Sequence, residues 1–505
     1  MDSTNEGRKV VSELLEFIIT LLNRYEEKDE GDATPQINDD EATEEEEYKM
    51  YSSRWIALAV YALGSLANAM IWISFAPIAT VVSHTYSVNN TAVNMLSVIF
   101  MILYIPGTYL ASYLFKRFGL RGTILAANTL NVAGSVLRFA SIVGSKDSKA
   151  NNGGYALLLI GQGMCGLVQP IFVNAAALIA ATWFALEQRD LATVIASMAN
   201  PIGTGVGQIL PAMLVNEEGS GMSSLLLIQF AISGSILLLA YFLFLDKPPT
   251  PPSYTETLRE RREKKKGRRN RYSHRISDQS EIIQDGGPFS WHQISSLLKN
   301  RNFIKLAFGF SIGLAYFNSL ATVLGQQVNI LGYTDNDAGI FGALILGFGL
   351  IGCAIVGPIM DATHRYKTIL KTFSVMTFVT GFFVLPLLPL SFECMVECTY
   401  PVSEEVTNGI MLSMGNILSI GITFAWQSLI EKTSSYRGVY VSYNFLQVGI
   451  FVVCGFFILS FNGNYNRLNA EKAYREVSDR NRTDKSKNPT IIAKLSSNSE
   501  KIQKA

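Results

Sequence analysis

An apolar stretch near the start of the chain contains two side chains that could bind a solute. Asn68 and Trp72 lie within the apolar run 55–82, and four residues advance a helix by about 400°, so both fall on one face. A lipid-facing helix has no need of an amide. The face of an indole ring attracts organic cations without a counter-charge. The pair therefore indicates a surface that lines a solute path.

Other polar side chains lie far from the ends of their apolar runs. Gln162 and Gln169 are seven residues apart in one run, hence on one face, and Asn200 is central in the next. Membrane amides also join helices by hydrogen bonds, and a membrane tryptophan is often an interfacial anchor, so these structural roles remain alternatives. Arg138 lies late in its run, and its guanidinium is expected to reach the membrane surface.

The composition indicates a protein that crosses a membrane many times. Of 505 residues, 16% are charged and 49% are hydrophobic, and the charges crowd into the two ends and one central stretch. Runs of about twenty nearly uncharged residues recur between them, as expected of transmembrane helices. The four histidines form no cluster and the five cysteines lack metal-site spacing. We therefore expect no enzyme, no metal site and no cofactor.

Apolar length and turn residues predict about eleven membrane-spanning helices. The chain is thus predicted to be an all-α polytopic membrane protein. A polar insert at 246–300 opens with a proline-rich segment and interrupts the series. The predicted spans, six before the insert and five after it, cover residues 55–82, 94–115, 121–143, 155–184, 190–215, 222–245, 303–331, 338–360, 368–391, 407–430 and 438–461.

These spans divide the chain into five regions. The two ends are rich in charge and poor in apolar residues, so both are expected to be mostly disordered. The regions are a cytoplasmic N-terminal region at 1–53, a first six-helix bundle at 54–245, a cytoplasmic basic linker at 246–302, a second bundle at 303–461 and a tail at 462–505.

The placement of lysine and arginine predicts the orientation. Lys116, Arg117, Arg121 and the basic block 259–275 follow even-numbered spans, which places them and the N-terminus in the cytoplasm. The glycosylation sequon at Asn89 then faces outside. The basic block is interpreted as a solvated cytoplasmic loop. Contact with anionic lipid head groups is the more specific alternative, and nucleic-acid binding is excluded. The plasma membrane is the default location, and an intracellular membrane stays open.

A motif in the second bundle resembles the major facilitator superfamily. Gly357-Pro-Ile-Met-Asp361, with Arg365 beyond it, matches the superfamily's loop between the second and third helices of each half. The corresponding loop in the first half has Ser112 in place of the glycine and Lys116 in place of the aspartate. The resemblance implies two helical bundles that rock about a central cavity, with these loops at the cytoplasmic gate. The expected gating residues are Lys116, Arg117, Arg121, Gly357, Asp361 and Arg365.

A larger set of motifs, from about residue 54 to 461, resembles solute carrier family 49, the feline leukaemia virus subgroup C receptor-related group. Members of this family are associated with choline, ethanolamine, haem and pyridoxine transport, so the resemblance implies a small-solute transporter. The motifs are Arg54-Trp55, Asn68-Ala-x-x-Trp72, Gly119-Leu-Arg121, Gly134-Ser-Val-Leu-Arg138, Gly161-Gln-x-x-Cys165, Gln169, Trp183-Phe184, Asn200-Pro-Ile-Gly203 and Leu388-Pro-Leu-x-Phe392-Glu.

The resemblance carries over part of a choline site. Trp72 and Gln169 match two of its positions, whereas Asn318, beside Tyr316, and Asn416 stand where the family has an aromatic residue and a glutamine. These departures weaken the choline interpretation and leave another solute open. The candidate substrate-binding residues are Asn68, Trp72, Gln162, Gln169, Asn200, Tyr316, Asn318 and Asn416.

The resemblance also implies a departure in the number of helices. Family members have twelve, and their tenth ends at the segment that here runs from Leu387 to Pro401. This segment arrives about thirty residues after Lys367, which is too few for two spans of about twenty residues each. We therefore expect about eleven helices, with one missing from the second bundle. A counting error is the alternative.

The predicted function is transport of a small organic solute by alternating access, with a choline- or ethanolamine-like cation as the candidate. Apart from Glu393, near a span end, no membrane-embedded carboxylate stands out, so downhill, facilitated movement is expected. The expected partners are the solute and the lipid bilayer. A carrier of haem or another metabolite and a non-transporting membrane receptor or scaffold are the alternatives.

Overall fold

The part of the chain that the structure describes is built from helices. The computed structural model describes residues 49–143, 152–252, 256, 257, 295, 297–330, 332–363, 387–399, 402, 404–433, 442–463, 465–467 and 469. The segment Lys49–Gly463 forms one compact unit, which holds helices α2 to α16. None of the described residues forms a strand. The all-α prediction is confirmed.

The first bundle has helices over all six predicted spans. α2 and α3 together form the first span, α4 the second and third, α5 and α6 the fourth, and α7 and α8 the fifth and sixth. Their bounds are α2 Ser53–Ile73, α3 Ala79–Tyr86, α4 Asn90–Ala140, α5 Asn152–Asn174, α6 Ala176–Trp183, α7 Leu186–Leu214 and α8 Met222–Leu243.

The second bundle differs from the prediction at one helix. The predicted span 368–391 lies mostly outside the described residues, but helix α14 continues eight residues past its predicted end, so that boundary was wrong. Glu393 and Glu397 marked the end of the apolar run, yet both are buried within α14. The total of about eleven spans stays a prediction. The described helices of this half are α11 Arg301–Ile330, α12 Asp335–Thr363, α14 Leu387–Thr399, α15 Glu404–Thr433 and α16 Ser442–Leu459.

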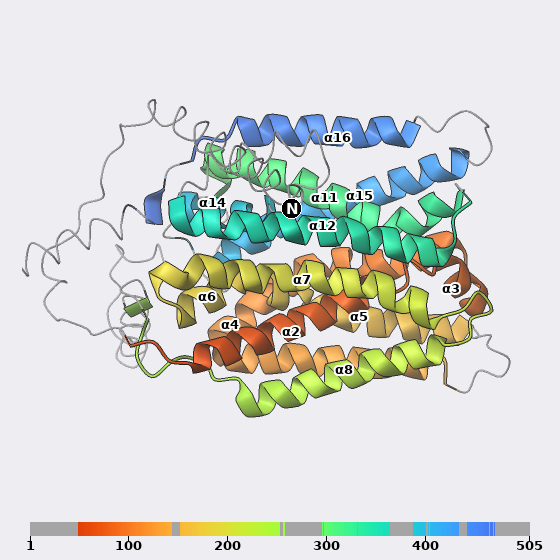
Figure 1. Cartoon of the computed structure of the whole chain (residues 1–505), viewed down its shortest axis with the longest axis horizontal. Coiled ribbons are helices and arrows are strands. Elements are labelled where there is room, and N and C mark those ends of the chain that lie inside the picture. Colours follow the sequence, from red (N-terminus) through yellow and green to blue (C-terminus); the bar gives the residue numbers. More distant parts are fainter. Residues whose placement is uncertain are drawn as a thin grey trace, which may run out of the picture. The chain divides into compact units, whose positions relative to one another are not determined.

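The two bundles lie against each other along two helix pairs. In Figure 1, helices α2 to α8 gather in one half of the unit and α11 to α16 in the other, and α7 packs on α12 while α4 packs on α15. We call the end with the turn at Ser87–Asn89 the outer end, following the predicted orientation, and the end with Gly119 the inner end. A cavity between the bundles would therefore be flanked by the α7–α12 and α4–α15 pairs.

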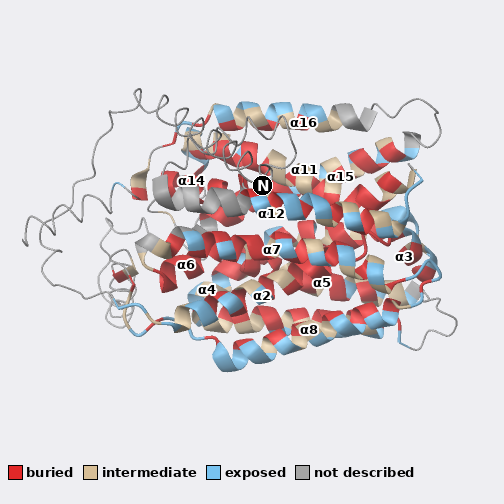
Figure 2. Ribbon diagram, viewed as in Figure 1, coloured by how far each residue is buried: buried red, intermediate tan, exposed pale blue. Residues whose placement is uncertain are grey.

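The outward faces of the bundles are apolar. Figure 2 shows exposed residues along the far sides of α8 and α16, and these include Phe242 at 72% and Phe456 at 69% exposure. Such large, exposed apolar side chains are unfavourable in water and favourable in lipid. Within the described residues, seven helices are long and apolar enough to cross a membrane. The unit therefore presents a lipid-facing surface.

A broken helix lies beside the predicted solute path. α2 ends at Ile73 and α3 begins at Ala79, and Pro77 in the break has no amide proton to continue the helix. Arg138 is 1% exposed, donates from Nη2 to Ser74 Oγ at 2.9 Å and has its guanidinium carbon 5.1 Å from the ring centroid of Phe75. The expectation that Arg138 reaches the membrane surface was wrong. Its positive charge lies instead at the C-terminus of α2, where the helix dipole is negative.

The sharp turn inside α4 depends on glycine and on a carboxylate from another helix. Gly119 has φ +69°, and an added Cβ would lie 2.9 Å from Asp246 Oδ1. Asp246, just beyond α8, accepts a hydrogen bond from the Arg121 amide at 2.8 Å. The loop lacks the family's own aspartate because Lys116 replaces it. Asp246 nevertheless brings a carboxylate to this turn from a distant part of the sequence.

Candidate functional site

A cavity lies between the two bundles. Its empty volume is about 980 Å³, open solvent included. Of the described residues that line it, none is charged at neutral pH. Its aromatic lining residues are Trp72, Tyr104, Phe172, Phe310, Phe317 and Phe392, and its polar lining residues include Ser65, Gln169, Ser197, Asn200, Asn318, Ser391 and Asn416.

Three of the predicted residues line the wall that the first bundle contributes. Trp72 donates from its indole nitrogen to Ser97 O of α4 at 3.2 Å, which fixes the ring. Gln169 makes no side-chain hydrogen bond to the described residues, and the side-chain nitrogen of Asn200 has no partner among them. Unpaired amides next to a cavity are available to a bound solute.

Two more predicted residues line the facing wall of the second bundle, and these two are paired. The amide nitrogen of Asn318 donates to Asn416 Oδ1 at 3.4 Å and to Ser419 Oγ at 3.2 Å. Asn416 donates to Leu412 O at 2.9 Å. These amides have less unused hydrogen-bonding capacity than Gln169 and Asn200. Among the predicted residues that line the cavity, the side-chain amides still available to bind a solute therefore belong to the first bundle.

The structure does not bring Asn68, Gln162 or Tyr316 to the cavity. Asn68 donates to Asn131 Oδ1 at 3.1 Å and to Cys165 O at 2.9 Å, and Gln162 donates to two carbonyls at the end of α2. The ring of Tyr316 packs 4.5 Å from that of Phe451. These side chains connect helices within a bundle. Helical periodicity places Asn68 on one face with Trp72 and Gln162 on one face with Gln169, but it does not show which neighbouring helix covers them; Tyr316 is a candidate from the family resemblance alone.

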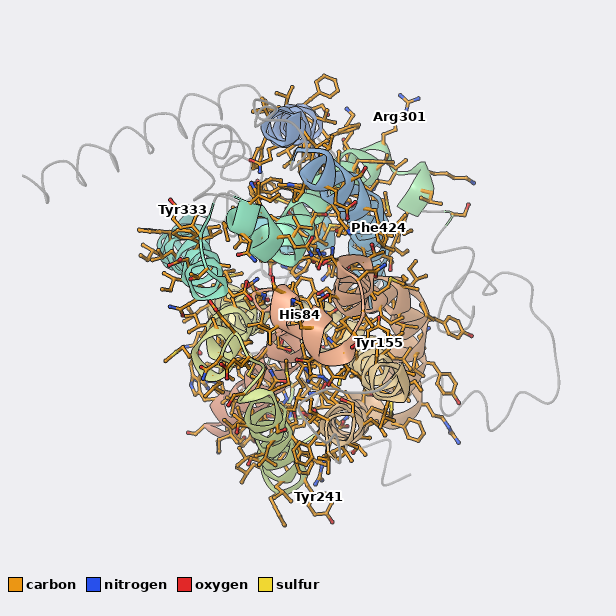
Figure 3. The ribbon with its side chains drawn as sticks, turned by 90° about the vertical axis from the view of Figure 1, so that its right-hand side faces the viewer. His84, Tyr155, Tyr241, Arg301, Tyr333 and Phe424 are labelled. Atoms are coloured by element: carbon orange, nitrogen blue, oxygen red, sulfur yellow. The ribbon has the colours of Figure 1, made fainter. Side chains whose placement is uncertain are left out.

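The predicted gating and modification residues lie at the two ends. Lys116 and Arg117 are exposed at the inner end, and Arg121 donates to Tyr241 O at 3.1 Å. Figure 3 shows Tyr241 at the edge of the molecule on α8. Asn89 is exposed at the outer end and caps α4 by accepting from Ala92 N at 2.9 Å.

Some of the predicted residues lie outside what the structure describes. Gly357 and Asp361 belong to α12, but their side chains are not described. Arg365 and the basic block 259–275 lie outside the described residues.

Sequence reasoning missed several lining residues. Ser65 precedes Trp72 by seven residues, so the same face periodicity that paired Gln162 with Gln169 could have found it. Ser391 and Phe392 belong to a motif used only for recognition of the family. Tyr104 and Phe172 had no local signal, since aromatic residues are common on buried helix faces.

Polar side chains join the bundles at the outer end. Asn94 donates to Gln427 Oε1 at 2.9 Å and accepts from Gln326 Nε2 at 2.7 Å. Gln427 also donates to Thr91 Oγ1 at 3.2 Å. We call Thr91, Asn94, Gln326 and Gln427 the outer clasp. All four side chains are neutral, so these bonds hold the bundles together without an ion pair.

The bundles also meet towards the inner end. Gly409 of α15 lies so close to the first bundle that an added Cβ would be 2.5 Å from Thr108 Cγ2 and 3.1 Å from Asn174 Nδ2. Tyr104, which lines the cavity, donates to Asn174 Oδ1 at 2.6 Å. The cavity is thus bordered by close packing at one end and by the outer clasp at the other.

Comparisons with known proteins agree with this architecture. Residues 61–456 match the profile of the Major Facilitator Superfamily. The chain is 30% identical to solute carrier family 49 member A3 of Xenopus tropicalis, over 76% of this chain and 79% of that protein. It is 26% identical to the choline/ethanolamine transporter FLVCR2 of Homo sapiens, over 79% and 76% of the two chains.

Solved transporter structures share the fold. A fucose:proton symporter from E. coli superposes with a TM-score of 0.55 at 13% identity, covering 81% of this chain and 98% of that one. A D-xylose-proton symporter gives a TM-score of 0.52 at 12% identity, covering 81% and 96%. Identities this low establish likeness of fold alone.

Proposed function

Since this chain belongs to the Major Facilitator Superfamily and, within it, to solute carrier family 49, it is a multi-pass membrane transporter and not an enzyme, and we propose that its solute is a small organic cation. The observation that carries the proposal is the aromatic and uncharged lining of the cavity between the bundles. The relatives named choline/ethanolamine transporters support the same class of solute.

The lining suits an ammonium group. Each ring face attracts a cation by about 0.5–2 kcal/mol, more when water is excluded. Trp72, held by its bond to Ser97, offers a fixed ring, and Gln169 offers an unpaired amide to a hydroxyl or amine on the same solute. Because the described lining carries no carboxylate, the cation enters without forming an ion pair. This favours moderate affinity and ready release.

Alternating access then requires the two ends to open in turn. The outer clasp consists of neutral hydrogen bonds, each worth about 0.5–1.5 kcal/mol net. Such bonds break without stranding a buried charge. The close packing of Gly409 against Thr108 restricts the inner end in the same conformation. Separation of α15 from α4 would open either end.

We propose facilitated rather than proton-coupled movement. A proton relay needs a titratable group on the solute path. Glu393 and Glu397 are buried on α14 but do not line the cavity, whereas Ser391 and Phe392 of the same helix do. The membrane potential would then be the main electrical force on a cationic solute.

The test is uptake of labelled choline and ethanolamine by proteoliposomes containing the full chain. We expect saturable uptake that Trp72→Ala reduces strongly and Trp55→Ala leaves intact. Trp55 is a matched control, since it lies on the same helix, is 40% exposed and does not line the cavity. Equal uptake by the two variants would remove Trp72 from the site. Absence of uptake of either solute by the unmodified protein would overturn the proposed solute class.

A further inference from the structure

Two wholly buried serines from opposite bundles line the same cavity with their hydroxyl groups unpaired. Ser65 of α2 and Ser391 of α14 are each 0% exposed, and neither Oγ has a hydrogen-bond partner among the described residues. Helical serines commonly donate to the carbonyl four residues earlier, as Ser233 and Ser419 do here. A buried hydroxyl without a hydrogen-bond partner destabilises the folded protein, so a ligand that bonds to these two serines would remove that cost.

Two aromatic rings accompany these hydroxyl groups. Phe310 of α11 and Phe392 of α14 both line the cavity, and their ring centroids are 5.8 Å apart at an interplanar angle of 40°. Phe392 is the immediate neighbour of Ser391. The Ser391 hydroxyl, which could bind a polar tail, therefore belongs to the residue next to one of two adjacent rings that could bind a cation, and Ser65 lines the same cavity from the first bundle.

This group lies further towards the inner end than the site around Trp72. Ser65 precedes Trp72 by seven residues on α2, which corresponds to about 10 Å along the helix, and Phe310 precedes Asn318 by eight residues on α11, about 12 Å. Ethanolamine, with its N–C–C–O chain of ordinary bond lengths, spans roughly 4 Å. A solute of that size cannot contact both groups at once.

We propose that Ser65, Ser391, Phe310 and Phe392 form a second binding position, the inner position, for the same class of solute on its way to the inner end. This rests on the proposed function. The rings hold the ammonium group, and rotation about χ1 turns the serine hydroxyls to the polar tail. Because Ser65 and Ser391 belong to different bundles, a solute in the inner position contacts both halves of the transporter.

The test is calorimetric titration of the purified full chain with two probes, ethanolamine and tetramethylammonium, which lacks a hydroxyl group. Unmodified protein is expected to bind two ethanolamine molecules. Ser65→Ala and Ser391→Ala should each weaken one of the two binding events by on the order of 2- to 10-fold. Neither variant should change the binding of tetramethylammonium, which cannot use the hydroxyls. Trp72→Ala should weaken the other event.

Ser235→Ala is the matched control, because Ser235 is exposed on α8 and bonds only to Ala231 O of its own helix. A single binding event that neither serine variant alters would overturn the inner position and leave the proposed function standing. An equal loss of affinity for ethanolamine and tetramethylammonium would also overturn the inner position, because it would show that the substitution distorts the packing around the cavity. The proposed function fails separately if the unmodified protein neither binds nor transports the probes.

Discussion

Asn94 on α4 donates its side-chain amide to Gln427 Oε1 on α15 at 2.9 Å, and this bond joins residues 333 positions apart in the sequence. Both side chains are buried. The bond belongs to the outer clasp and connects the two bundles at the end predicted to face outside. Its role in the transport cycle can be tested without any knowledge of the solute.

Removal of the clasp should shift the protein towards an outward-open state. Asn94→Ala removes two neutral hydrogen bonds of about 0.5–1.5 kcal/mol each, so the population of the open state relative to the closed state should rise by about 5- to 150-fold. Spin labels at His84→Cys and Tyr333→Cys, both on the outer face in Figure 3, would report the separation. Asn90→Ala, at an exposed asparagine of the same helix, should leave the distance distribution unchanged. An unchanged distribution in Asn94→Ala would contradict a gating role.

The ring at position 72 should matter more than its bulk. Trp72→Phe keeps an aromatic face, whereas Trp72→Leu keeps an apolar side chain alone, so we expect leucine to weaken choline transport roughly 2- to 30-fold relative to phenylalanine. The measurement is the KM for choline uptake. Competition by 3,3-dimethyl-1-butanol, a neutral compound of the same shape, serves as the comparison. Effective competition by this alcohol would show that charge is not recognised.

Replacement of Ser65 should not destabilise the protein in the absence of solute. Its hydroxyl is buried without a partner, and removal of an unpaired polar group is neutral or stabilising. We expect Ser65→Ala to melt at the same temperature as the unmodified protein or higher. Ser319→Ala, which removes a hydroxyl bonded to Ser419 O and Thr423, should melt lower. A markedly lower melting temperature for Ser65→Ala would mean that the Ser65 hydroxyl has a hydrogen-bond partner within the folded protein.

The turn within α4 should not tolerate a side chain at position 119. Gly119→Ala forces a residue with a Cβ into a left-handed conformation, at about 1–2 kcal/mol, and places that Cβ against Asp246. A lower melting temperature is expected. Gly234→Ala on α8, where a Cβ would meet nothing within 4 Å, should be neutral or stabilising. Equal behaviour of the two variants would show that the turn is not constrained.

Uptake should respond to membrane potential and not to a proton gradient. An inside-negative potential favours entry of a monovalent cation by about 2.3 kcal/mol per 100 mV, whereas the described cavity lining offers no carboxylate or histidine to carry a proton. Uptake into proteoliposomes, measured with a potassium diffusion potential or with a pH step alone, separates the two forces. Stimulation by the pH step at constant potential would refute facilitated transport.

The sequence by itself determined the class of the protein and much of its candidate site. Long uncharged runs enter the bilayer, where backbone N–H and C=O groups must pair with each other within helices. The six spans of the first bundle therefore follow from composition and length. Helical periodicity and family motifs also singled out Trp72, Gln169 and Asn200 before any contact was known. All three line the cavity.

The tertiary structure alone decided what each polar side chain faces. Asn68 and Gln162 carry the same local signals as Gln169, yet they bond to neighbouring helices. Asp246 accepts a hydrogen bond from the Arg121 amide, 125 positions away in the sequence, and Ser391 lines the same cavity as Ser65 from the other half of the chain. Helical periodicity shows which residues share one face of a helix, but it does not show which part of the protein that face packs against. That surface is set by packing between segments far apart in the sequence, which no local pattern encodes.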